Sequence, residues 1–196
     1  MRDYDSAAPG ASPVKVLIAG GFGVGKTTLV SAISEIDPLR TEERLTAAGV
    51  GVDDLDGIEN KAATTVAMDF GRLTLHHAGI VLYLFGTPGQ ERFWFLWDDL
   101  LHGALGAIVL VDTRRLDRSF PAIDFFENRG LPFVVAANCF HGEQPYTVEE
   151  INAALHLRDP NTPVLLLDAR SRDDVRGALL SLLEVLIARA RPTSPV

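Results

Sequence analysis

The first apolar run of the chain leads directly into a glycine-rich octapeptide, GGFGVGKT at residues 20–27. The octapeptide fits the pattern G-x-x-x-x-G-K-[ST], and an amphipathic stretch follows it. Glycines let the backbone turn tightly so that successive N–H groups converge on a phosphate, while the positive end of the following helix points at the same place. The feature therefore predicts a strand, a phosphate-binding loop and a helix, and a chance glycine-rich turn is the less favoured interpretation.

The octapeptide and the residue after it supply the candidate phosphate ligands. Lys26 would reach the β- and γ-phosphates of a nucleoside triphosphate, and the Thr27 hydroxyl would coordinate Mg²⁺. The predicted nucleotide-binding residues of this segment are Gly21, Phe22, Gly23, Val24, Gly25, Lys26, Thr27 and Thr28. The loop alone indicates a nucleoside triphosphate but not which one.

The rest of the chain repeats a short apolar run, a turn and an amphipathic stretch, which is typical of βα units around a largely parallel sheet. Strands are predicted at Val14–Ala19, Ala67–His76, Ile80–Phe85, Ala107–Val111, Phe133–Ala137 and Val164–Leu167. Helices are predicted at Lys26–Ile36, Phe93–Leu101, Arg118–Asn128, Val148–Leu155 and Asp173–Arg189. The mixed polar pattern of residues 67–76 favours an edge strand, and the acidic, aperiodic residues 37–63 are expected to form a long loop.

Composition limits the class of protein. The 196 residues, 47% apolar, suit one domain, predicted at residues 14–190 between flexible tails at 1–13 and 191–196. The formal net charge of −8 argues against nucleic acid or anionic lipid as a partner. One cysteine excludes an internal disulfide and, with five histidines, leaves no zinc cluster. No apolar stretch reaches the roughly 20 residues of a spanning helix, so we expect a cytoplasmic protein that reaches a membrane only through a partner.

Two further segments carry a family resemblance. Thr65 precedes the second apolar run, and the sequence FGTPGQERF at residues 85–93 follows the third. With the phosphate loop, these segments make residues 14–190 resemble the Ras-like small GTPases, in which Thr65 matches the switch I threonine and residues 89–91 match switch II. The chain is most similar to the bacterial branch of MglA-type proteins and actinobacterial conservon D-type GTP/ATP-binding proteins. The resemblance implies an α/β P-loop NTPase, a Ras-like G domain with a mostly parallel six-stranded sheet flanked by helices on both faces.

The resemblance also assigns roles to residues. Thr65 would close over the γ-phosphate and Mg²⁺, and Gln90 would orient the attacking water, so that Gln90, Lys26 and Thr65 are the expected catalytic residues. Thr27 and Thr65 would hold Mg²⁺, and GTP or GDP would be the bound nucleotide. The remaining expected nucleotide contacts are Gly89, Asn138, His141, Ala169 and Arg170.

Two departures from the family pattern concern the phosphates. Gly86 ends the third predicted strand where the family usually has an aspartate that holds Mg²⁺ through water, so metal affinity is expected to be weak. Asp112 offers a carboxylate of the kind found in other P-loop ATPases, although a turn or helix-capping aspartate is the commoner interpretation. Phe22 stands inside the phosphate loop where Ras has glycine. Its ring would either obstruct Gln90 and slow hydrolysis or fold away onto a switch segment.

Two more departures concern the base and turnover. The base-reading motif N-K-x-D becomes NCFH at residues 138–141. Asn138 can still anchor the loops and Cys139 is expected to pack as a small hydrophobe, but a neutral His141 offers one acceptor where an aspartate accepts two guanine N–H groups. Ala169 resembles the residue whose backbone N–H reads guanine O6. Thr64 replaces the intrinsic arginine of MglA-type proteins; the nearby arginines, which are more typical of solvated charges, are Arg40, Arg44 and Arg92.

The aromatic segment FWFLW at residues 93–97 follows switch II directly. On a helix, Phe93 and Trp97 share a face and can be core, Phe95 points the opposite way, and Trp94 lies at the margin. A helix apolar nearly all round is either buried on both sides or a docking surface. The expected partner-binding residues are Arg92, Phe93, Trp94, Phe95 and Trp97. By the family resemblance the partner would be a roadblock/LC7-type protein.

Three functions remain open from the sequence. The favoured one is a signalling protein that binds GTP with Mg²⁺, hydrolyses it slowly and presents switch II to a partner. The second is a P-loop ATPase or small kinase with relaxed base specificity. The third is a degenerate nucleotide-binding scaffold, which Phe22, Gly86 and His141 together suggest.

Overall fold

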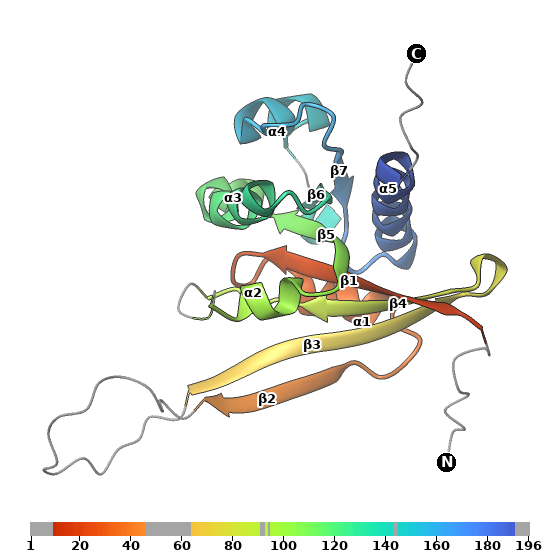
Figure 1. Ribbon diagram of the computed structural model, residues 1–196. Helices are drawn as coiled ribbons and strands as arrows, with labels where there is room; N and C mark the ends of the chain where they lie inside the picture. Colours follow the sequence, from red (N-terminus) through yellow and green to blue (C-terminus); the bar gives the residue numbers. More distant parts are fainter. Residues whose placement is uncertain (1–9, 46–63, 91–92, 94, 143–144, 191–196) are drawn as a thin grey trace, which may run out of the picture.

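The computed structural model describes residues 10–45, 64–90, 93, 95–142 and 145–190, which form a seven-stranded sheet with helices on both faces (Figure 1). The strands are β1 (Ser12–Gly20), β2 (Leu39–Leu45), β3 (Thr64–Leu75), β4 (Ile80–Gly86), β5 (Ala104–Val111), β6 (Phe133–Asn138) and β7 (Val164–Leu167). Their order across the sheet is β2-β3-β4-β1-β5-β6-β7. The strands β4, β1, β5, β6 and β7 run parallel to one another, whereas β3 pairs antiparallel with both β2 and β4. The predicted fold class is confirmed, with one strand more than the six expected.

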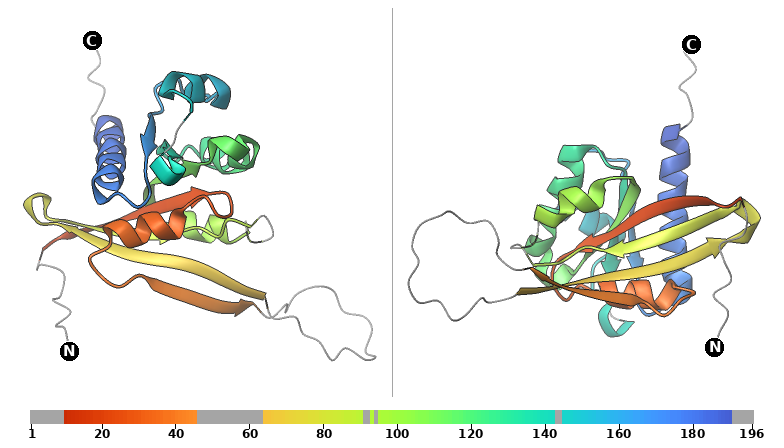
Figure 2. Two further views of the ribbon diagram at one scale, coloured as in Figure 1. Left: turned by 180° about the vertical axis from the view of Figure 1, so that it is seen from behind. Right: turned by 60° about the horizontal axis from the view of Figure 1, so that its bottom comes forward.

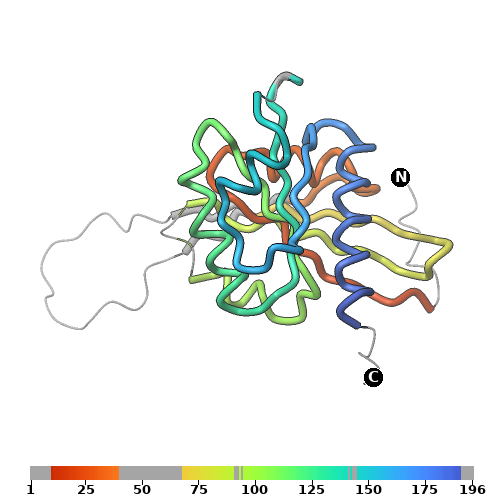
Figure 3. The backbone as a smooth tube through the Cα atoms, turned by 90° about the horizontal axis from the view of Figure 1, so that it is seen from above, coloured from red at the N-terminus to blue at the C-terminus, as the bar shows by residue number. Residues whose placement is uncertain are grey.

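Two layers of helices cover the sheet. The helices are α1 (Lys26–Ile33), α2 (Phe95–Leu101), α3 (Phe120–Arg129), α4 (Val148–Leu155) and α5 (Arg172–Ala190), with short 3₁₀ turns η1 (His76–Ala78), η3 (Thr113–Ser119) and η4 (Phe140–Gly142). One core cluster joins α1 and α5 to one face of the sheet, and a second joins α2, α3 and α4 to the other. Figure 3 shows α5 on one side of the parallel strands and α3 and α4 on the opposite side.

Strand β1 runs through the middle of this sandwich. Its apolar residues alternate between the two cores: Val16 and Ile18 face α1 and α5, and Leu17 and Ala19 face α2 and α3. All four are essentially inaccessible to solvent. A strand buried on both faces has no place for a polar side chain, which explains why this part of the sequence is an unbroken apolar run.

The edge of the sheet differs from the prediction. Residues 67–76 were expected to form an edge strand, but β3 pairs with β2 on one side and β4 on the other. The actual edge is β2, which lies in the segment expected to be a loop. Its sequence, LRTEERL, carries the charges that protect an exposed strand edge from pairing with other chains. The mixed pattern of β3 instead reflects an antiparallel strand that is only half-buried.

The hairpin of β2 and β3 extends beyond the helical layers, beside α1 (Figure 2). Helix α1 packs against β3 and β4 on the same side of the sheet. None of the helices in the described parts of the chain has the length and apolar character needed to cross a membrane.

Candidate nucleotide-binding site

The glycine-rich octapeptide forms the connection between β1 and α1, at the carboxyl end of the parallel strands. Gly23 and Gly25 have φ angles of 75° and 109°, which favour glycine. A Cβ on Gly25 would also lie 2.7 Å from Asn138 Nδ2. The backbone of the loop therefore requires glycine at these two positions.

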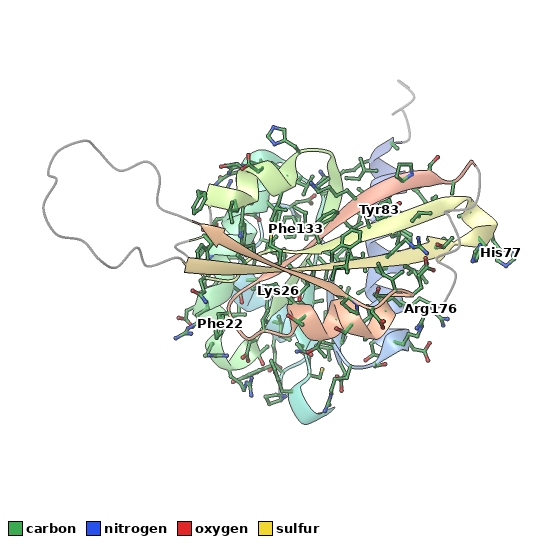
Figure 4. All side chains as sticks on the ribbon, turned by 90° about the horizontal axis from the view of Figure 1, so that it is seen from below. Phe22, Lys26, His77, Tyr83, Phe133 and Arg176 are labelled. Carbon is green, nitrogen blue, oxygen red and sulfur yellow. The ribbon has the colours of Figure 1, made fainter. Side chains whose placement is uncertain are left out.

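Lys26 curls back over this loop. Its Nζ donates hydrogen bonds to the carbonyl oxygens of Gly20 and Gly21 at 2.9 and 2.8 Å. Burial lowers the pKa of Lys26 to about 8, although the charge of Asp69 acts in the opposite direction. Lys26 and Phe22 lie toward the same end of the sheet, and His77 lies at the other (Figure 4). The two hydrogen bonds to the carbonyl oxygens hold the Lys26 ammonium beside the loop.

The Thr27 hydroxyl donates a 2.5 Å hydrogen bond to Oδ2 of Asp69, a residue of β3. Asp69 is the register partner of Gly86, and a Cβ on Gly86 would lie 3.2 Å from Asp69 Oδ2. The carboxylate of Asp69 therefore occupies space beside the position where the family pattern has its aspartate. Sequence reasoning missed Asp69. The signal was a single carboxylate within the otherwise apolar stretch VAMDF.

Gly89 lies directly on the phosphate loop. A Cβ on Gly89 would stand 2.6 Å from Lys26 Nζ and 2.9 Å from both the Gly21 oxygen and the Phe22 nitrogen. The structure thus brings the predicted switch II segment into contact with the predicted phosphate ligands. It does not do so for Thr65, which lies four residues before Asp69 in β3. At ~3.3 Å per residue, that separation is about 13 Å. The side chain of Thr65 lies outside the described part of the structure.

A pocket of about 370 Å³ opens between the phosphate loop, the predicted switch II segment, α2, η3 and the start of α3. It is lined by Gly20, Gly21, Phe22, Gly89, Gln90, Trp97, Asp117, Arg118, Pro121 and Ala122. Phe22 is 65% exposed, so its ring is not packed on a switch segment in this conformation. Phe22 and Gln90 instead line the same pocket. This is the arrangement expected if the Phe22 ring obstructs Gln90.

Asn138 holds the base end of the site together. Its buried side chain donates from Nδ2 to the Val24 oxygen at 2.9 Å and accepts the Ala169 N–H at Oδ1 at 3.0 Å. The predicted anchoring role is confirmed. This second hydrogen bond occupies the N–H of Ala169, which was expected to read guanine O6.

The other base-end residues differ in how far the structure describes them. Cys139 is half-buried, with Sγ 3.9 Å from the Ala137 oxygen. Arg170 turns its exposed guanidinium to Asp168 at 2.6 Å. His141 belongs to η4, and its side chain lies outside the described part.

Asp112 has a structural role. Its carboxylate caps η3 by accepting the Arg114 N–H at 3.0 Å and also binds the side chains of Arg114 and Arg115. Hydrogen bonding from the Arg114 side chain, the largest effect, holds the pKa of Asp112 below its usual value. The capping interpretation is confirmed.

The aromatic segment divides into buried and exposed residues. Phe93 and Trp97 are 5% and 2% exposed, so neither offers a docking surface in this conformation. Trp97 lies on the face of α2 that packs on α3, and Phe93 precedes the helix. Phe95 points the other way and is 59% exposed. Arg92 and Trp94 lie outside the described residues, as do the side chains of Arg40 and Arg44.

Comparison with solved structures gives the fold its class. The chain is similar to the cytosolic domain of the FeoB iron transporter of T. maritima in its GDP form II, with a TM-score of 0.62 and 16% identity, over 94% of this chain and 68% of that one. The apo form gives a TM-score of 0.62 and 18% identity, over 94% and 67% of the two chains. At 16% and 18% identity, structural similarity shows the fold alone. The chain is a phosphate-loop domain with the Ras-like GTPase fold.

Sequence comparison gives the family. Residues 18–188 match the family described as "conserved hypothetical ATP binding protein", and the chain belongs to it. It is 31% identical over 127 residues to the uncharacterized protein MJ1339 of Methanocaldococcus jannaschii, covering 64% of this chain and 69% of that protein. It is 27% identical to the Ras-related protein Rab-32C of Dictyostelium discoideum, over 72% of this chain and 59% of Rab-32C. Rab-18 of Caenorhabditis elegans is 33% identical, over 56% of this chain and 44% of Rab-18. The chain thus spans less than two thirds of either Rab protein.

Proposed function

We propose that this chain is a nucleotide-dependent switch that binds GTP or GDP with Mg²⁺ and hydrolyses GTP slowly. The observation that carries the proposal is the bond between the Thr27 hydroxyl and Asp69, which stands beside the Lys26 ammonium on a glycine-rich loop. Backbone N–H groups and an ammonium suit a polyphosphate, and a hydroxyl beside a carboxylate suits the metal that accompanies it.

The metal part of the proposal rests on the chemistry of these oxygens. Magnesium prefers hard oxygen ligands and is usually held by one or two carboxylates together with phosphates and water. Thr27 and Asp69 meet this requirement, and Thr65 would join them if the start of β3 closed over the site. Bound there, Mg²⁺ would neutralise charge on the phosphate oxygens. Asp69 thereby supplies the carboxylate that Gly86 lacks, and we no longer expect weak metal affinity.

The hydrolysis part assigns the attacking water to Gln90 and the slow rate to Phe22. Both line one pocket beside Gly89, and the Phe22 ring is free to occupy the space in front of Gln90. In single-turnover experiments the variant Phe22→Gly is expected to hydrolyse GTP about tenfold faster, a lowering of the barrier by ~1.4 kcal/mol, because the ring no longer stands in the way of the water that Gln90 orients. Hydrolysis as slow as in the unaltered protein would remove Phe22 from the proposal.

The base is the part with a second candidate. An ATP-binding domain of relaxed specificity is favoured by one contact, the Ala169 N–H donated to Asn138. Titration of the purified chain with fluorescent GTP, GDP and ATP, with and without Mg²⁺, separates the alternatives. Tight, Mg²⁺-dependent guanine binding supports the switch, an adenine preference supports the second candidate, and no binding supports a scaffold.

The partner part rests on Phe95 and on the family resemblance. An exposed aromatic ring on a helix next to switch II suits a partner that senses the nucleotide, and a cytoplasmic roadblock/LC7-type protein is the partner we propose. Any recruitment to a membrane would go through it. The variant Phe95→Ser should lose capture of a purified roadblock/LC7-type protein in the triphosphate state. The exposed Leu180 of α5, changed to Ser, is the matched control.

A further inference from the structure

Trp97 connects the phosphate site to the helical layer. It is 2% exposed, and its Nε1 donates a 3.0 Å hydrogen bond to the carbonyl oxygen of Pro88. Its ring packs edge-on against Phe125, with centroids 5.1 Å apart, and stacks on Phe126, with centroids 5.9 Å apart. One side chain of α2 therefore contacts both the rings of α3 and the backbone that follows β4.

That backbone leads directly to the phosphate loop. Gly89 follows Pro88, and a Cβ on Gly89 would lie 2.6 Å from Lys26 Nζ. A terminal phosphate held by Lys26 would thus lie against the same peptide that accepts the Trp97 N–H. Such a phosphate would act on the peptide at one end, and the indole holds the peptide at the other.

Helix α2 is in turn fastened to α3. The Arg129 guanidinium binds the carboxylate of Asp98 on α2, with Nε 2.8 Å from Oδ1, and lies 4.0 Å over the centre of the Phe125 ring. Trp97 neighbours Asp98 and contacts the same Phe125 ring. A shift of Pro88 that carried the indole along would have to repack α2 on α3, because a close-packed contact cannot deform gradually.

We propose that Trp97 is a positioning residue: its indole N–H holds the Pro88–Gly89 peptide against Lys26 and thereby couples the terminal-phosphate position to the packing of α2 on α3. The inference rests on the proposed function, since it concerns how that site discriminates triphosphate from diphosphate. Phe95 lies on the same short helix two residues before Trp97, so the coupling reaches the exposed ring that we assign to the partner.

A variant that keeps the ring and removes the donor tests this role. Trp97→Phe leaves an aromatic side chain against α3 but frees the Pro88 carbonyl. We expect the ratio of GTP-analogue affinity to GDP affinity to change about five- to tenfold, the usual effect of one buried hydrogen bond. The matched variant Phe125→Leu loosens the packing around the indole without touching its N–H, and its ratio should stay within twofold of the unaltered protein.

A fluorescence experiment on the folded, active chain gives an independent readout. Trp94→Phe leaves Trp97 as the single tryptophan, since the chain has two. Replacement of GDP by a non-hydrolysable GTP analogue should shift its emission maximum, and the same exchange in Trp94→Phe/Lys26→Ala should not.

The outcomes separate this inference from the function on which it rests. An unchanged affinity ratio in Trp97→Phe, or equal changes in Trp97→Phe and Phe125→Leu, would show that Trp97 only fills the core, and so would a constant emission maximum. The nucleotide switch would survive either result. Failure of the unaltered chain to bind any nucleotide would overturn both.

Discussion

The phosphate end and the base end of the proposed nucleotide site differ in how the structure compensates for departures from the Ras-like pattern. At the phosphate end the family's aspartate is missing at Gly86, yet a carboxylate stands beside that position, because Asp69 projects from the neighbouring strand. At the base end the loop anchor Asn138 is intact, but His141 stands where the Ras-like pattern has its aspartate, and the nearby carboxylate of Asp168 is engaged by Arg170.

The contrast follows from what each end recognises. A phosphate is bound by converging backbone groups and by charges that can come from any nearby strand, so a lost side chain can be replaced from across the sheet. A base edge is read by a few hydrogen bonds of fixed direction, and a carboxylate elsewhere cannot take over that geometry. We therefore expect strong phosphate dependence and weak base selectivity.

The largest effect should come from Lys26. The variant Lys26→Ala removes a buried charged partner of the phosphates and should weaken GTP binding by about 100-fold or more in fluorescence titration. The control is Lys15→Ala, since Lys15 lies in the first half of β1, away from the phosphate loop, and donates to the His102 oxygen. A comparable loss of GTP affinity in both variants would indicate nonspecific electrostatics, and Lys26 would then have no special role at the phosphate end.

Asp69→Asn tests whether the neighbouring strand replaces the missing aspartate. The amide keeps the shape and the acceptor for Thr27 but removes the charge, so the Mg²⁺ concentration needed for half-maximal GTP binding should rise about ten- to a hundredfold. Asp112→Asn removes a buried carboxylate of η3 and should leave the Mg²⁺ requirement unchanged. A raised Mg²⁺ requirement in Asp112→Asn and an unchanged one in Asp69→Asn would indicate that Asp112, rather than Asp69, holds the metal.

The low pKa of Lys26 predicts a pH dependence. Polyphosphate binds the ammonium, which loses its proton as the pH rises through about 8. Binding of GTP should therefore be about tenfold weaker at pH 9 than at pH 7, with uptake of about half a proton per nucleotide at pH 8. Calorimetry in two buffers of different ionisation enthalpy measures that uptake. A constant affinity over this range would mean that Lys26 keeps its proton in the nucleotide-free protein.

The lowered pKa of Lys26 changes the stability of the fold in the opposite direction to GTP binding as the pH rises. In the unfolded chain Lys26 keeps its proton up to its ordinary value of 10.5. Between about pH 8 and 10.5 the unfolded state thus binds more protons than the folded state, and this group alone makes the free energy of unfolding rise with pH.

The smallest effect should appear at the base end. His141→Asp restores a carboxylate at the base-reading position and should raise the ratio of GTP to ATP affinity about fivefold, or ~1 kcal/mol. Asn138→Ala should weaken both nucleotides alike, because Asn138 ties the loops rather than choosing the base. A ratio unaffected by His141→Asp would place base selection outside this motif.

Much of the fold was predictable because its signals are local. The six predicted strands are all present, and α4 and β7 have the predicted bounds. Helix α1 ends at Ile33 rather than Ile36 because Ser34 is extended and its hydroxyl binds the Ile36 oxygen. Strand β2 was missed because an edge strand shows charge rather than periodicity. Phe93 and Trp97 were predicted both as core and as partner residues, and only the tertiary structure, in which both are buried and Trp97 packs on α3, decided for the core.

The octapeptide by itself determined the strand, the loop and the helix, because glycine's backbone freedom and an apolar run act over neighbouring residues. The tertiary structure alone decided which carboxylate meets Thr27. Asp69 is 42 positions away in the chain and reaches the hydroxyl only because β3 and β4 pair in the register that sets Asp69 opposite Gly86. Contacts of this kind depend on which strands become neighbours, and no local pattern in the sequence specifies that.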